Sequence, residues 1–91
     1  MRSDPDNVVT RLLIGTAQCQ LGKYDEASHL LKALVEENPS DAPARIALAG
    51  VYMGLGQAPA AQTELRKAIE LNPKLSEAYF NMAQIILASK P

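Results

Sequence analysis

The 91-residue sequence predicts an all-α fold built from stacked helix–turn–helix repeats. Shifting the sequence by 34 residues aligns it with itself, and such a fixed period is typical of repeat architectures. Pro5, Pro39 and Pro73 align under this shift, as do Gly22 and Gly56. Between them, apolar side chains recur at helical spacing, and strand-like alternation is missing. We therefore expect about five helices, arranged as two complete repeats and one half repeat.

The same period appears in the columns expected to form the core. Two neighbouring columns hold large apolar and small side chains: Ile14, Leu48 and Met82, then Gly15, Ala49 and Ala83. The period also divides the chain into segments. We expect residues 1–7 to be the end of a preceding repeat or a tail, 8–41 repeat one, 42–75 repeat two, and 76–91 the first helix of a third, incomplete repeat.

Repeat one is predicted to contain helices over residues 8–21 and 24–37. Asn7 can cap the first helix, because its side chain can accept a hydrogen bond from a free N–H group of the first turn. Gly22 interrupts the pattern, and Pro39 ends the second helix because proline lacks an N–H donor. The residues expected to face the core are Ile14, Gln18 and Leu21 in the first helix, and Ala27, Leu31 and Leu34 in the second.

Repeat two is predicted to contain helices over residues 42–54 and about 59–71. Asp41 is the expected N-cap of the first of them. Pro43 fits its first turn, where a proline costs no hydrogen bond. Ala61 lies in the small-residue column where the two helices should cross, so we expect it to be buried.

A fifth helix is predicted over residues 74–88. The residues expected to face inward are Tyr79, Met82, Ala83 and Ile86. A complete repeat would cover part of this set with its own second helix. An uncovered end helix favours association, so we expect a homo-oligomer formed through this terminal helix.

The residues that recur at equivalent positions of the repeats resemble the tetratricopeptide repeat pattern over residues 8–91. Repeat two carries the pattern at Leu48, Ala49, Tyr52, Gly56, Ala61, Leu65, Ala68 and Pro73. Repeat one carries it at Ile14, Gly15, Gly22, Tyr24, Ala27, Leu31 and Pro39. The resemblance implies a short right-handed superhelix with a concave, ligand-binding groove.

Three features depart from the family pattern. Arg11 and Arg45 replace the usual bulky apolar residue. Gln18 stands at the position of Tyr52, and Leu34 stands at the position that Ala68 occupies in repeat two. We therefore expect repeat one to pack more loosely than repeat two.

Composition narrows the classes of function. The chain is 47% hydrophobic and 21% charged, with a net charge of −1. Near-neutral charge favours neither nucleic acid nor an anionic membrane as a partner, and no apolar run is long enough to span a bilayer. The first residues contain no apolar segment of the secretory kind, so a cytoplasmic location is the default expectation.

Catalytic and metal chemistry are also disfavoured. Cys19 and His29 are the only residues of their types, and helical geometry directs them to opposite sides. One cysteine and one histidine cannot supply the usual four ligands of a zinc site. Lys32 with Glu36, and Arg66 with Glu70, are spaced as surface ion pairs along one helix. We expect no catalytic residue, no metal and no cofactor, and hence no enzyme activity in this chain.

A second stripe on the first helix of each repeat is the candidate binding surface. Its residues are Leu12, Thr16 and Cys19, then Ile46, Gly50 and Met53, then Phe80, Gln84 and Leu87. The resemblance implies that these columns line a mostly apolar concave groove for a peptide or helix. The alternative is that neighbouring repeats cover these side chains. A clamp for a C-terminal carboxylate, known in the family, is disfavoured because Glu77 would repel an anion and only Asn81 has a suitable side chain.

The sequence thus predicts a protein–protein interaction module, a scaffold or adaptor segment of a larger protein. Two alternatives stay open at this point. The first is a structural segment that self-associates through its exposed ends. The second is an accessory region of an enzyme whose catalytic domain lies outside this chain.

Overall fold

The fold is seen in a computed structural model, which describes residues 5–89. It contains the helices α1 (Pro5–Gln20), α2 (Tyr24–Glu37), α3 (Ala42–Gly54), α4 (Ala58–Leu71) and α5 (Ser76–Ser89). The described residues form no strand. The predicted all-α fold with five helices is therefore confirmed.

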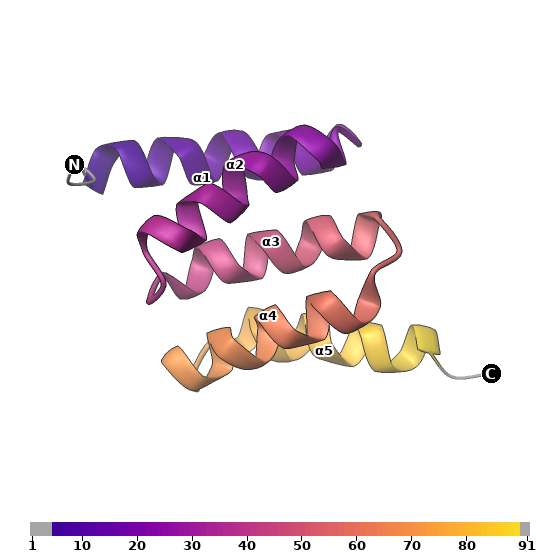
Figure 1. The fold of residues 1–91 in the computed structure, drawn as a ribbon. Coiled ribbons are helices and arrows are strands. Elements are labelled where there is room, and N and C mark those ends of the chain that lie inside the picture. Colours follow the sequence, from indigo (N-terminus) through magenta and orange to yellow (C-terminus); the bar gives the residue numbers. More distant parts are fainter. Residues whose placement is uncertain (1–4, 90–91) are drawn as a thin grey trace.

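The helices form two layers (Figure 1). The first helices of the repeats, α1, α3 and α5, run in the same direction, and α2 and α4 run back against them. α2 packs on both α1 and α3, and α4 packs on both α3 and α5. The molecule measures 46 × 29 × 17 Å, so its thin dimension accommodates about two helix layers. None of the described helices is both long and apolar enough to cross a membrane.

Local signals place most helix ends. The Oδ1 atom of Asp41 accepts a hydrogen bond of 3.1 Å from the N–H of Ala44, so the predicted N-cap of α3 is confirmed. The bounds of α2 and α3 match the prediction, while α4 begins one residue earlier and α5 two residues later than expected. Gly22 and Gly56 have φ values of 81° and 75°. The α1–α2 and α3–α4 turns thus use a left-handed conformation that glycine adopts at least cost.

The predicted start of the first helix is wrong. α1 begins at Pro5 rather than at residue 8, so Asn7 lies inside the helix and does not cap it. Proline suits the first turn because its φ is already helical and its missing N–H would have had no partner there. Residues 1–4 of the predicted tail lie outside the described part of the chain.

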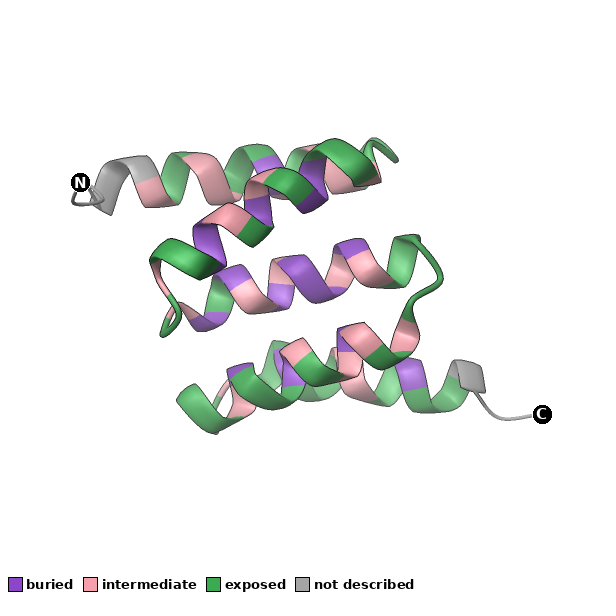
Figure 2. Ribbon diagram, viewed as in Figure 1, coloured by how far each residue is buried: buried purple, intermediate pink, exposed green. Residues whose placement is uncertain are grey.

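Two apolar clusters form the core (Figure 2). The first joins α2 to α3, and its α2 residues Ala27, Leu31 and Leu34 are fully buried, as predicted. The second joins α3, α4 and α5 around Ala61 and Leu65, which are also fully buried. Fully burying a leucine side chain stabilises the fold by roughly 1.5–3 kcal/mol. The second helices thus hold successive first helices together.

The predicted inward stripe of the first helix is wrong in part. Ile14 is 47% exposed, and Leu21 lies exposed in the turn after α1. Of the α1 residues whose burial the structure describes, only Gly15 is buried. Leu48, in the same column as Ile14, is only 3% exposed because α2 covers it. The described chain places no corresponding helix against Ile14.

The predicted inward face of the fifth helix is also wrong. Tyr79, Ala83 and Ile86 are exposed, and Met82 is half-buried. The buried residues of α5 are instead Ala78 and Ile85. The face of α5 that carries Ala78 and Ile85 packs against the preceding repeat. The predicted face is instead equivalent to the face of α3 that packs against α4. The prediction chose the side that a following helix would cover.

In the described part of the chain, the salt bridges Arg11–Glu37 and Arg45–Glu64 join the layers, and neither connects neighbours along one helix. The Nη1 and Nη2 atoms of Arg11 donate to both carboxylate oxygens of Glu37, at 2.8 and 2.9 Å. The Nη1 atom of Arg45 donates to Glu64 at 2.8 Å, and its Nε donates to the carbonyl of Pro39 at 3.0 Å. Both arginines of the first helices are therefore directed at the second helices.

Candidate functional site

A hollow of about 370 Å³ lies where α1, α3 and the start of α5 meet. We call it the α1–α3 hollow. Its walls are mostly apolar and come from three helices: Leu12, Leu13, Thr16, Cys19 and Gln20 of α1, Pro43, Ile46, Ala47 and Gly50 of α3, and Glu77 and Asn81 of α5. A concave, mostly apolar site with a few polar groups is what ligand sites of this size have in common.

The repeat explains why these side chains meet. Leu12 and Ile46 are equivalent residues of adjacent first helices, as are Thr16 and Gly50. α1 and α3 pack directly against each other, so the two columns form one continuous floor. Ile46 is buried in that floor. Gly50 leaves it open, because a Cβ atom there would meet nothing nearer than the Sγ atom of Cys19, at 4.0 Å.

Five of the nine predicted groove residues line this hollow: Leu12, Thr16, Cys19, Ile46 and Gly50. The other four lie outside it. Met53 is exposed in the last turn of α3, and Phe80, Gln84 and Leu87 are exposed on α5. The hollow crosses the helices diagonally, because α1 contributes residues from its middle to its end, α3 residues from its first turn to Gly50, and α5 only its first turns. The predicted groove residues of α5 are therefore not brought to the same place as those of α1 and α3.

Six lining residues were not among the predicted groove residues: Leu13, Gln20, Pro43, Ala47, Glu77 and Asn81. Ala47 and Leu13 are equivalent in the repeat and lie one residue beyond the predicted stripe. A wider stripe on each first helix would have included them. Glu77 and Asn81 lie four residues apart, and hence on one side of α5.

The polar side chains that line the hollow are few, and most of them are uncharged. The Thr16 hydroxyl donates to the carbonyl of Leu12 at 2.8 Å, so its proton is already used. Burial raises the pKa of the Cys19 thiol, which keeps that side chain uncharged at neutral pH. Among the residues that line the hollow, Glu77 is the one with a charged side chain.

The opposite side of the molecule is different in character. A second, more open hollow of about 380 Å³ lies over α2, α3 and α4, beside the Arg45–Glu64 salt bridge. Lys32 lies over the Tyr52 ring there, with its Nζ atom 5.8 Å from the ring centroid. Charged residues dominate this side, and its ion pair and cation–π contact already partner several of them.

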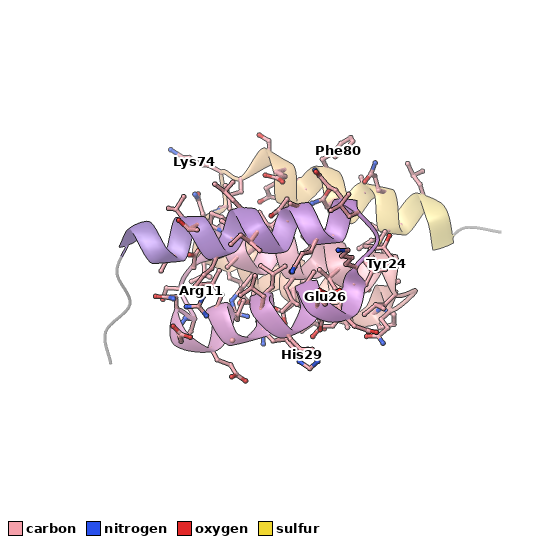
Figure 3. The ribbon with its side chains drawn as sticks, turned by 90° about the horizontal axis from the view of Figure 1, so that it is seen from above. Arg11, Tyr24, Glu26, His29, Lys74 and Phe80 are labelled. Carbon is pink, nitrogen blue, oxygen red and sulfur yellow. The ribbon has the colours of Figure 1, made fainter. Side chains whose placement is uncertain are left out.

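The two residues weighed for chemistry lie apart. Cys19 lines the α1–α3 hollow, whereas His29 is exposed on α2. In Figure 3, His29 points from one edge of the molecule and Phe80 from the other. Within the described residues, no three side chains of His, Cys, Asp or Glu gather as metal ligands would.

Comparison with known proteins agrees with the repeat architecture. The tetratricopeptide repeat family model matches residues 1–43 and again residues 20–86. No curated protein matches the chain. The two matches together span most of the sequence and the helix pairs described above. The chain therefore belongs to the tetratricopeptide repeat family.

Proposed function

We propose that this chain is a protein–protein interaction module that binds a peptide or helix of a partner in the α1–α3 hollow. Tetratricopeptide repeats generally mediate protein–protein interactions. The observation that carries the proposal is a mostly apolar hollow bounded by three helices, with Gly50 in its floor. An apolar side chain of a partner would be removed from water there, at roughly 25 cal/mol for each Å² buried.

Gly50 offers a direct test, because a side chain at this position would extend into the hollow without disturbing the core. Phage-displayed random dodecapeptides are selected on the wild-type protein, and the enriched sequences are synthesised. Their affinity is then measured by fluorescence anisotropy for the wild type, Gly50→Leu and the matched control Gly50→Ala. We expect at least a tenfold loss for Gly50→Leu and less than a twofold change for Gly50→Ala.

Two results would contradict this function. One is that no peptide is enriched on the wild-type protein. The other is that the enriched peptides bind Gly50→Leu as well as the wild type, which would place their site elsewhere. Circular dichroism of each variant, together with its thermal midpoint, separates a blocked hollow from a damaged fold.

We propose self-association through α5 as a second candidate function. It is favoured by an apolar surface formed by Tyr79, Phe80, Ile86 and Leu87, all of which are exposed. Contiguous exposed apolar surface of this kind often marks an interface. A closed dimer would place the same surface of two copies together. These four residues are few beside the roughly 20–30 residues that each partner contributes to a standard interface, so we expect a weak dimer.

Sedimentation velocity over a range of concentrations tests this second candidate. We expect the mean mass to rise with concentration, and Ile86→Lys to abolish the rise. Ser40→Lys is the control, because it adds the same charge at an exposed position in the turn between α2 and α3, outside α5. A monomeric mass up to high micromolar concentration for the wild type would refute self-association.

A further inference from the structure

We infer that the partner peptide of the α1–α3 hollow is basic: it inserts an apolar side chain and pairs a neighbouring lysine or arginine with Glu77. This inference rests on the proposed function and specifies the chemistry of the ligand at that site. It is carried by the distribution of charge around the hollow.

The arginines on the helices that form the hollow are directed away from it. Arg11 and Arg45 are on the helices that form the hollow, but both turn to the other layer, where they pair with Glu37 and Glu64. Lys74, in the turn before α5, extends from the same edge of the molecule as Phe80 (Figure 3), but it does not line the hollow. The described lining therefore offers a single charge, which is negative.

Glu77 is placed to act on a ligand at the rim. It is exposed in the first turn of α5, and Asn81 lies beside it one turn later. The floor next to this pair is apolar and includes Ile46 and Ala47. A peptide that fits both regions needs an apolar anchor and, within a few residues of it, a cation that reaches the carboxylate.

The chemistry of the lining disfavours the opposite kind of ligand. An acidic peptide would bring like charges together at Glu77 and would meet no cation among the residues that line the hollow. Complementary charge at the rim of an interface mainly sets specificity and the rate of association. Apolar burial would thus supply the bulk of the affinity, and Glu77 would select among apolar peptides.

The selection described above tests this inference through the composition of the enriched peptides. We expect lysine or arginine within three residues of a large apolar residue in the peptides whose binding is lost in Gly50→Leu. For these peptides, Glu77→Lys should weaken binding at least tenfold. Replacing the peptide's lysine by glutamate should restore binding to Glu77→Lys and weaken binding to the wild type.

Glu26→Lys is the matched control. Glu26 is also an exposed acidic residue in the first turn of a helix, so the change alters net charge and helix stability in the same way. It lies in α2, away from the hollow, and we expect less than a twofold effect on binding. Circular dichroism confirms that both variants fold.

The outcomes separate the two proposals. Peptides that depend on Gly50 but are acidic or neutral, or that are insensitive to Glu77→Lys, overturn this inference and leave the proposed function standing. A loss of binding on acetylation of the peptide's N-terminus, without an effect of Lys→Gln in the peptide, also overturns it, because an amino terminus would then be the cation. Enriched peptides that ignore Gly50 overturn the proposed function itself.

Discussion

α3 and α5 occupy equivalent positions in successive repeats, and one side of each is built in the same way. Ala44 and Val51 of α3 are fully buried, as are the equivalent Ala78 and Ile85 of α5. In both helices this face packs against the preceding repeat. A small residue and a β-branched residue, seven positions apart, thus make the same contact twice.

The other side of the two helices differs. Ala49 of α3 is buried, whereas the equivalent Ala83 of α5 is exposed. α4 covers this side of α3, and the described chain has no helix there for α5. In a repeat array, burial is therefore set by the neighbouring helices as much as by the residue itself.

The largest expected effect contrasts equivalent alanines. Ala49→Arg should destabilise the fold by more than about 3 kcal/mol, because overpacking costs about 1–3 kcal/mol and the buried charge adds to it. Ala83→Arg should change stability by less than about 0.5 kcal/mol, as is usual at exposed positions. Urea denaturation followed by circular dichroism measures both. Equal midpoints would show that α5 is covered in solution.

A second contrast is between Leu48 and Ile14, which share one column at the centre and at the start of the array. Leu48→Ala should cost about 2–5 kcal/mol, as is typical of buried large-to-small changes. Ile14→Ala should cost less than half as much, because Ile14 is about half exposed. Thermal unfolding compares the two variants. A larger loss for Ile14→Ala would mean that another surface covers α1.

The equivalent arginines provide a third contrast. The side chains of Arg45 and Glu64 are 11% and 14% exposed, whereas those of Arg11 and Glu37 are 18% and 45% exposed. Glu64→Gln should therefore cost about 1.5–3 kcal/mol, the range for a hydrogen bond to a charged group. Glu37→Gln should cost less than about 1 kcal/mol. The smaller effect should fade in 1 M salt, which screens exposed charges, and a Glu37→Gln effect that salt leaves unchanged would argue against this.

Replacing a glycine by alanine should change stability in opposite directions in α1 and α3. A Cβ atom at Gly15 would lie 2.7 Å from Leu31, so α1 and α2 approach each other closely at this position. Gly15→Ala should destabilise by about 1–2 kcal/mol after the gain in helix propensity. Gly50→Ala should stabilise by about 0.5–1 kcal/mol, since it meets nothing closer than 4.0 Å. Chemical denaturation gives both signs, and a stabilising Gly15→Ala would contradict the close approach.

The smallest effect concerns Cys19. Burial raises the pKa of its thiol, and the thiolate is the form that reacts. Alkylation by iodoacetamide should therefore be slower in the folded protein than in urea at pH 8–9, and its rate should level off at a higher pH. Any stability that the neutral thiol contributes is present below the ordinary cysteine pKa and is lost as pH rises towards the raised one. Equal rates folded and unfolded would show that Cys19 is open to solvent.

Elements with local signals were predictable from the sequence. The bounds of α2 and α3, the Asp41 cap and the burial of Ala61 all follow from caps, prolines and helical spacing. These signals act over a few residues, so they need no knowledge of what packs against the helix. The period of 34 residues then placed equivalent residues in columns and indicated the family.

The tertiary structure alone decided which side of an end helix is covered and which columns meet. Helical spacing identifies an apolar face of α1 or α5, but not whether a neighbour lies against it. The Arg11–Glu37 and Arg45–Glu64 pairs join residues 26 and 19 positions apart, beyond the reach of a spacing argument along one helix. The diagonal course of the hollow depends on how successive first helices are offset, so Glu77 and Asn81 replace Phe80 and Gln84 beside Ile46 and Gly50.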